Sequence, residues 1–381
     1  MSDPIVIIGS GMAGYAVARE FRKLNSEAPL LMITQDDGTS YSKPMLSTGF
    51  AKSKTAAELA MASAADMSEQ LNMSIRTHAK VEALDTATKE LLVDGTSVRY
   101  EKLVLATGAQ VHVLPFLPAD TSRVCSINDL NDYSNFREKC AGLKRIAIIG
   151  TGLIGCEYAN DLLNGDFEID LIGPGNEVLD ALLPAEASKC VTQALSDAGI
   201  NLHLGQTVVA IEEQNENVVI ALESGEKIQA DLVISAIGLK PNSGLAEAAG
   251  IAVNKGIVCD RTLETSAKDV FSIGDCAEVD GHVLLYVLPL MAGAKALAKT
   301  LNGNSTELNY GVMPVMVKTP ACPVVVLPPN SNDGEWTSES DGFNSKSVFK
   351  NANGDILGFA LTGDMTKEKQ ALSKLAPPIH G

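Results

Sequence analysis

The stretch Ile5-Val6-Ile7-Ile8-Gly9-Ser10-Gly11-Met12-Ala13-Gly14 decides the fold of this 381-residue chain. Its four apolar residues predict a strand buried on both faces, and the apolar spacing over 12–24 predicts a helix directly after it. A G-x-G-x-x-G motif between a strand and a helix is typical of dinucleotide binding. Gly9 permits the tight turn, Gly11 lets a pyrophosphate approach the backbone, and Gly14 lets helix and strand pack closely. The N-terminus of the helix would then offer free N–H groups to the pyrophosphate.

A second motif of the same form, Gly150-Thr151-Gly152-Leu153-Ile154-Gly155, follows the apolar strand expected at 145–149. Two such motifs predict two bound dinucleotides, and a flavin with a hydride-donating nicotinamide is the obvious pair. The acid that usually binds the ribose should stand near the end of the next strand, where this sequence has Gly173. Between 173 and 188 there is also no Lys or Arg that could hold a 2′-phosphate. The absence of a cation favours NADH over NADPH.

The acidic residue that would bind the ribose at the first motif is displaced from its usual position. The strand expected at 30–33 leads into Thr34, and the nearest acids are Asp36 and Asp37. We expect either Asp36 or backbone groups to hold this ribose.

Composition excludes several classes of function. The net charge of −17 argues against a nucleic-acid partner, and no apolar run is long enough for a membrane span. The first strand begins almost at the N-terminus and leaves no room for a signal peptide, so we expect a cytoplasmic location. None of the seven cysteines forms a C-x-x-C pair. We therefore expect reduced, mostly buried thiols and no metal site.

The order of predicted elements indicates an α/β fold with an insertion. A second nucleotide-binding unit at roughly 120–235 interrupts the first, and antiparallel strands from about 311 onward predict a separate C-terminal module. The Ala- and Met-rich stretch 51–72 is expected to be helical, as is 184–198.

Several of these segments together resemble the two-dinucleotide pyridine nucleotide–disulfide oxidoreductase superfamily. They are Gly9–Gly14, Ala106-Thr107-Gly108, Gly150–Gly155 with Cys156-Glu157, and Ile273-Gly274-Asp275. Three shorter segments, 41–47, 285–287 and 317–323, are similar in sequence to the branch of this superfamily that reduces rubredoxin, a one-electron iron carrier. The resemblance implies an enzyme that passes electrons from NADH through FAD to rubredoxin. This enzyme would be part of an electron-transfer pathway for the hydroxylation of alkanes.

The resemblance also implies two Rossmann-like, three-layer dinucleotide-binding domains and a small α+β domain. The expected boundaries are 1–115 with 236–310 for the FAD-binding domain, 116–235 for the inserted NAD-binding domain, and 311–381 for a C-terminal interface domain.

Roles for single residues follow from the same resemblance. Lys43 and Glu157 are expected to meet beside the flavin, where a cation stabilises the charge that develops on reduction. Asp275 is expected to bind the ribityl chain from a helix N-terminus, although an ordinary helix cap is the alternative. Val81 would contact the adenine unless it is a plain strand valine, and Lys318 would reach the pyrimidine end of the flavin unless it is a solvated strand lysine.

The residues expected to bind FAD are Gly9, Gly11, Met12, Ala13, Gly14, Thr34, Asp36, Lys43, Pro44, Val81, Ala106, Thr107, Gly108, Glu157, Gly274, Asp275, Val287 and Lys318. Those expected to bind NAD are Gly150, Gly152, Leu153, Ile154, Gly155 and Gly238.

The cysteines separate this chain from thiol-dependent members of the superfamily. No cysteine pair stands near 40–55, and Thr48 occupies the place of the single cysteine that peroxide-reducing members carry. Direct electron transfer from the flavin is therefore expected. A reductase of another iron–sulfur carrier, either a ferredoxin or a flavorubredoxin, remains an alternative, as does a flavin-binding regulatory protein. We expect a monomer or a homodimer.

Overall fold

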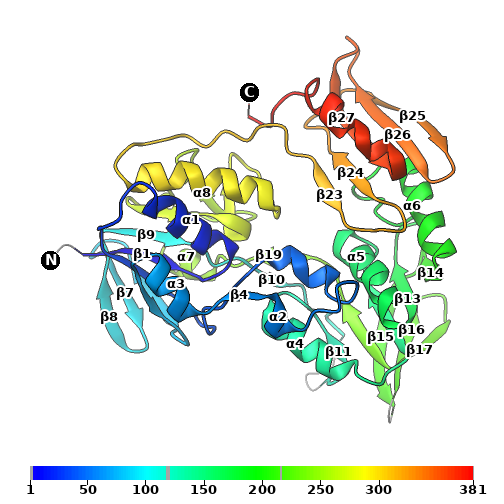
Figure 1. Ribbon diagram of the computed structural model, residues 1–381, viewed down its shortest axis with the longest axis horizontal. Helices are drawn as coiled ribbons and strands as arrows, with labels where there is room; N and C mark the ends of the chain where they lie inside the picture. Colours follow the sequence, from blue (N-terminus) through cyan, green and yellow to red (C-terminus); the bar gives the residue numbers. More distant parts are fainter. Residues whose placement is uncertain (1–2, 117–120, 215–216, 381) are drawn as a thin grey trace. The chain divides into compact units, whose positions relative to one another are not determined.

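The computed structural model describes residues 3–116, 121–214 and 217–380, which form two compact units (Figure 1). The first unit comprises Met1–Ser42, Ala60–Gln110 and Leu239–Tyr310, and the second comprises Lys43–Leu59, Val111–Gly238 and Gly311–Gly381. Each unit contains one of the two glycine motifs. Residues 1–2, 117–120, 215–216 and 381, which the predicted domains include, lie outside the described residues.

A five-stranded parallel sheet forms the centre of the first unit. In spatial order its strands are β21 (Val270–Ser272), β9 (Lys102–Leu105), β1 (Ile5–Ile8), β2 (Leu30–Ile33) and β5 (Ser74–Arg76). All four residues of β1 are buried, as expected for a parallel strand covered on both faces.

Each face of this sheet is covered by a different layer. Val6 and Ile8 pack with Leu84 and Leu91 of an antiparallel meander. The meander consists of β6 (Val81–Asp85), β7 (Glu90–Val93) and β8 (Thr96–Arg99). Figure 1 shows two adjacent helices, α1 (Met12–Arg22) and α8 (Val287–Leu301), on the opposite face. These are the three layers that the resemblance implies.

Smaller elements complete the first unit. They are the strand pairs β3 (Ser40–Tyr41) with β4 (Ala60–Ala62), β10 (Ala109–Val111) with β19 (Leu239–Pro241), and β20 (Ile257–Cys259) with β22 (Ala277–Val279), and the helices α3 (Ala64–Gln70) and α7 (Gly244–Ala248).

The single helix predicted for 51–72 is wrong. The structure has a short helix α2 (Ala56–Leu59), then strand β4, then α3. Pairing of β4 with β3 competes with helix formation, and Ser63 then starts α3 with a capping box to Asp66. Met61 in β4 is 69% exposed, so the apolar composition of the stretch does not reflect a buried helical face.

The second unit repeats the architecture of the first. Its parallel sheet has the order β11 (Val124–Cys125), β18 (Leu232–Ser235), β12 (Arg145–Ile149), β13 (Glu168–Gly173) and β14 (Asn201–Leu204). A meander again covers one face, formed by β15 (Val208–Gln214), β16 (Asn217–Leu222) and β17 (Lys227–Ala230). The remaining helices of this part are α4 (Leu130–Lys139), α5 (Leu153–Leu162) and α6 (Ala185–Asp197). The helix predicted at 184–198 is thus confirmed.

The C-terminal part of the second unit is an antiparallel sheet. Its order is β23 (Val315–Val317), β24 (Val324–Leu327), β27 (Ile356–Thr362), β26 (Asn344–Lys350) and β25 (Glu335–Asp341). Helix α6 packs against β25, β26 and β27 (Figure 1), and the short helix α9 (Lys369–Ser373) follows β27 in the sequence. The predicted α/β fold with a small α+β module is confirmed. In the described part of the chain, no helix is both long and apolar enough to cross a membrane.

Candidate functional site

The first glycine motif forms a turn with one open position. Gly9 has φ +109°, and a Cβ there would collide with the carbonyl oxygen of Ala106. A Cβ on Gly14 would collide with the carbonyl oxygen of Gly9, so helix α1 lies against the turn. At Gly11 a Cβ would have no described atom within 4 Å. Gly9 and Gly14 are therefore needed for packing, whereas Gly11 leaves the space that a pyrophosphate requires.

The N-terminus of α1 has no side chain closing it. Its N-cap is Gly11, which makes no side-chain cap hydrogen bond, so first-turn N–H groups face the space beside the motif. A Cβ on Gly274, which has φ +80°, would lie 2.7 Å from the Cβ of Ala13. The structure thus brings the Gly274-Asp275 segment and Ala106 to the first motif, as the sequence predicts.

Asp275 lies near the start of a very short helix. It lies in a single 3-10 turn, η3 (Gly274–Cys276), and not at the start of the long helix α8, whose N-cap is Tyr286. The expected helix start is thus a three-residue 3-10 helix after β21, and binding of the ribityl chain by Asp275 stays a prediction. The turn forms because Gly274 adopts a positive φ against α1, which an apolar-strand pattern cannot reveal.

Asp36 closes the turn after β2. One of its carboxylate oxygens accepts hydrogen bonds from the hydroxyls of Ser10 (2.7 Å) and Thr34 (2.6 Å) and from the backbone N–H of Gly38 (2.9 Å). The carboxylate is exposed and ties the first motif to the end of β2. Its second oxygen is left for a ribose, so the ribose role of Asp36 stays a prediction.

Sequence reasoning missed Asn242, which holds the Thr107-Gly108 segment. Its amide donates to the carbonyl of Thr107 (2.8 Å), and its backbone N–H donates to the carbonyl of Gly108 (2.9 Å). The hydroxyl of Thr107 donates in return to the carbonyl of Asn242 (2.8 Å). The sequence gives little indication of this contact, because Asn242 follows Thr107 by 135 positions.

Two further residues of the predicted FAD set lie in the first unit, and one of them, Val81, packs against its core. Val81 is the first residue of β6 and is partly buried, and Val287 is the first residue of α8 and is 36% exposed. Their roles stay predictions.

The second glycine motif repeats the geometry of the first. Gly150 has φ +117°, and a Cβ there would collide with the carbonyl oxygen of Ala236, while one on Gly155 would collide with that of Gly150. Gly152 again has no described atom within 4 Å of a Cβ and is the N-cap of α5 without a side-chain hydrogen bond. Ile154 stands exposed in the first turn.

Gly238 lies three residues after the end of strand β18. It has φ +108°, and its carbonyl accepts a hydrogen bond from the backbone N–H of His112. The residues present in both motifs therefore fit a dinucleotide pyrophosphate, which the open glycine and the free helix end would hold.

One face of α5 carries a buried polar cluster, consisting of Glu157, Asn160 and Asp161. These three residues are spaced so that they lie on one stripe of the helix. Asn160 accepts the backbone N–H of Ala321, and Asp161 accepts those of Phe50 and Ala51. Burial raises the pKa of Asp161 although these donors lower it. Helix α5 thereby holds two distant segments of the chain beside the second glycine motif.

Glu157 is the centre of this cluster. Its side chain is 1% exposed and accepts from Lys318 Nζ (2.7 Å), from the Lys318 backbone N–H (2.9 Å) and from the Ser47 hydroxyl (2.6 Å). Lys318 Nζ also donates to the carbonyl of Pro44 (2.6 Å) and to the hydroxyl of Ser47 (2.7 Å). An ammonium has three N–H donors, and these three acceptors use all of them.

Glu157 has an ion-pair partner that the resemblance does not imply, and its meeting with Lys43 stays a prediction. Glu157 forms its ion pair with Lys318, while Lys43 Nζ donates to the side chain of Asn128 (2.8 Å). The structure brings Lys43, Pro44, Glu157 and Lys318 into one unit, but it gives Glu157 a partner that sequence reasoning assigned elsewhere. The expected contact of Lys318 Nζ with the flavin would require it to give up one of these three hydrogen bonds. Ser47 and Asn128 were also missed, because neither belongs to a motif.

Comparison with known proteins adds two family matches. Residues 3–297 match the model of the pyridine nucleotide-disulphide oxidoreductases. Residues 307–376 match the rubredoxin binding C-terminal domain.

Curated relatives match along the whole chain. The rubredoxin-NAD(+) reductase of Alcanivorax borkumensis is 48% identical over 378 residues, which cover 99% of each chain. The protein of the same name from Acinetobacter baylyi is 42% identical, covering 99% of this chain and 98% of the relative. The nitric oxide reductase FlRd-NAD(+) reductase of Aliivibrio fischeri is 37% identical, covering 96% and 97%.

A solved structure shares the fold. The ferredoxin reductase of the CYP199A2 system from Rhodopseudomonas palustris has a TM-score of 0.89 at 23% identity, covering 99% of this chain and 96% of its own.

Proposed function

The chain belongs to the pyridine nucleotide-disulphide oxidoreductase family, and from this premise we propose that it passes electrons from NADH through FAD to rubredoxin. It is an oxidoreductase with FAD and NAD(H) as cofactors. The observation that carries the proposal is the combination of two dinucleotide cradles with a C-terminal segment, 307–376, that matches a rubredoxin binding domain.

We propose that the two cradles divide the work. The turn around Gly11, with the Gly274-Asp275 segment beside it, would hold FAD, and the turn around Gly152 would hold NADH. When bound, FAD accepts a hydride from NADH and releases electrons one at a time. The protein itself positions the cofactors. Each helix N-terminus would hold a pyrophosphate, and each closely packed glycine pair holds the helix against its turn.

The polar cluster of α5 is proposed to position the nicotinamide end of the site. Glu157 lies in the second turn of the helix whose N-terminus would bind the pyrophosphate. Its bonds to Lys318 and Ser47 join strand β23 and the segment 43–48 to that helix. A fixed ammonium in this place supplies positive charge without reorganisation, which is how a preorganised site favours developing negative charge. Lys43 remains a proposed second cation of the site.

No thiol is proposed to take part. Thr48 stands where a reactive cysteine would, and its hydroxyl donates to the carbonyl of Met45. Burial raises the pKa of the Cys156 thiol far above its usual range, which disfavours the reactive thiolate. Electrons would therefore leave directly from the flavin.

A second candidate acceptor is the rubredoxin-like carrier of a nitric oxide reductase. It is supported by the 37% identical relative from Aliivibrio fischeri, whereas the 48% identical relative supports free rubredoxin. A role in alkane oxidation remains part of the proposal for rubredoxin.

The two candidates are separated by steady-state reduction of purified carriers with NADH as donor. We expect kcat/KM for rubredoxin to exceed that for a flavorubredoxin domain, and both to exceed that for a [2Fe–2S] ferredoxin. A higher value for the flavorubredoxin domain would favour the second candidate, and turnover with ferredoxin alone would refute both.

A further inference from the structure

The end of strand β13 carries no acid that could bind the ribose of NAD, because Gly173 stands there and the Thr151 side chain lies where its Cβ would be. Gly173 is buried, and a Cβ there would lie 2.6 Å from Cγ2 of Thr151. Thr151 is the second residue of the glycine motif, so its side chain fills the space that an Asp or Glu at 173 would need. A side chain that selects for the ribose would therefore come from another residue of this unit.

The loop after β13 folds back onto the glycine motif. The backbone N–H of Leu179 donates to the carbonyl of Thr151 (2.9 Å), and Leu179 is 1% exposed. Leu179 also has φ +59°, a conformation that costs energy for a branched side chain and persists only where the surroundings impose it. This anchor fixes the position of the next residue, Asp180.

The side chain of Asp180 reaches back to the residues that follow the strand. Its two carboxylate oxygens are the nearest side-chain oxygens to a Cβ built on Gly175, one of them at 2.8 Å. The carbonyl of Gly175 accepts the N–H of Gly205 (2.7 Å) after β14, so the backbone under the carboxylate is held by the sheet. Asp180 is exposed, and no ion pair is found for it among the described residues. A carboxylate thus stands just past the end of β13, although its position in the sequence is seven residues later.

The charges around this loop oppose a 2′-phosphate. Glu177 and Asp180 lie in it, and the sequence has no Lys or Arg from 174 to 188. The first cation after the loop, Lys189, donates to Glu186 at 2.9 Å. A ribose 2′-hydroxyl would find an acceptor here, while a phosphate would meet the like charge of two carboxylates and no cation within the loop itself.

We propose that Asp180 is the residue that selects NADH over NADPH, as the acceptor for the adenosine ribose hydroxyls. The inference rests on the proposed binding of NADH by the second glycine motif and deepens it. It assigns to Asp180 the role that the residue at the end of the strand cannot perform.

The test uses the FAD-loaded protein and titrates NADH, NADPH, ADP-ribose and 2′-phospho-ADP-ribose by calorimetry. Asp180→Ala and Asp180→Asn should each weaken NADH and ADP-ribose about tenfold, the loss of one charge-assisted hydrogen bond. The same variants should bind the 2′-phosphorylated ligands at least as well as the unsubstituted protein, and Asp180→Arg should bind them more tightly. Asp166→Asn removes an exposed carboxylate of the same unit and should change neither Kd.

Unchanged ratios of NADPH to NADH affinity in all three Asp180 variants would overturn the inference. Absence of NADH binding by the unsubstituted protein would instead refute the proposed function, and with it the premise of the inference.

Discussion

Lys318 Nζ lies 2.7 Å from the buried carboxylate of Glu157, across 161 positions of the sequence. The Lys318 side chain is 33% exposed and that of Glu157 is 1% exposed. Water can therefore solvate the ammonium if Glu157 is removed, but it cannot solvate the carboxylate if Lys318 is removed. The pair joins the C-terminal sheet to the helix that starts at the second glycine motif. Its removal is therefore expected to affect both stability and function.

Lys318→Met should destabilise the protein more than Glu157→Gln does. The first variant leaves a buried carboxylate without its counter-charge, while the second leaves an ammonium that water can reach. We expect about 1–3 kcal/mol for Lys318→Met, with a favourable coupling of about 1 kcal/mol in the double variant. Thermal and urea unfolding of both single variants and the double variant measure it.

The exposed pair Glu186 and Lys189, also a direct ion pair, is the matched control. Its coupling should be below about 0.5 kcal/mol. Equal couplings for the two pairs would show that burial of Glu157 does not matter.

Asp170 gives a pH dependence with a defined sign. It is fully buried, and although burial raises its pKa, hydrogen bonds from His203 (2.9 Å) and Arg145 (2.6 Å) outweigh this and hold the pKa below its usual value. A carboxyl group with a lowered folded pKa stabilises the protein above its unfolded pKa, about pH 4, and loses that contribution as pH falls through the folded pKa.

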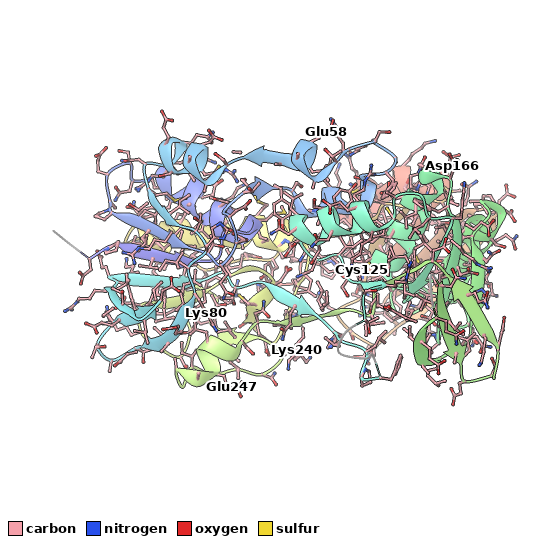
Figure 2. The ribbon with its side chains drawn as sticks, turned by 90° about the horizontal axis from the view of Figure 1, so that it is seen from below. Glu58, Lys80, Cys125, Asp166, Lys240 and Glu247 are labelled. Carbon is pink, nitrogen blue, oxygen red and sulfur yellow. The ribbon has the colours of Figure 1, made fainter. Side chains whose placement is uncertain are left out.

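The difference in Tm between the unsubstituted protein and Asp170→Asn should therefore be large at pH 6 and shrink towards pH 3. Asp166, labelled in Figure 2 and exposed after the short helix η2 (Leu163–Gly165), supplies the control, because Asp166→Asn removes a carboxylate without these partners. A Tm difference for Asp170→Asn that grows at low pH would contradict this assignment.

The thiols should be unreactive in the folded protein. Six of the seven cysteines are buried, and burial raises the pKa of the remaining one, Cys125 (Figure 2), to about 11. At pH 7.5 we expect slow reaction of at most one thiol with a disulfide reagent, and seven after denaturation. Rapid modification of a thiol with loss of NADH oxidation would contradict a mechanism without cysteine.

The open glycines should separate cofactor binding from folding. Gly11→Ala and Gly152→Ala add a Cβ to open space, so both variants should fold, but the first should lose FAD and the second should bind NADH weakly while staying yellow. Gly14→Ala and Gly155→Ala place a Cβ against backbone and should fold poorly. Absorbance of the bound flavin and calorimetry with NADH measure the difference.

Gly244→Ala and Gly311→Ala are the controls in the two units, since each also has room for a Cβ. Retention of FAD by Gly11→Ala at the level of Gly244→Ala would show that Gly11 does not face a pyrophosphate.

Local patterns predicted much of this fold. The buried strands β1 and β12, the glycine turns and the helices after them follow from neighbouring residues, and the structure places them as expected. The helix predicted over 51–72 failed because the pairing of β3 with β4 is non-local.

The site was predicted less completely for the same reason. Asn242 and the partner of Glu157 lie more than a hundred positions from the groups that they bind, and no motif marks them. The acid missing at Gly173 could be noticed from the sequence, but the folding of Asp180 back over Gly175 depends on the anchor between Leu179 and Thr151.

The most direct test of the central claim is anaerobic stopped-flow absorbance in two steps. The purified protein is first mixed with one equivalent of NADH and then with excess oxidised rubredoxin. We expect the flavin band to bleach and then return as rubredoxin is reduced, with two rubredoxins reduced per NADH. A flavin that stays oxidised with NADH, or stays reduced with rubredoxin, would contradict the account.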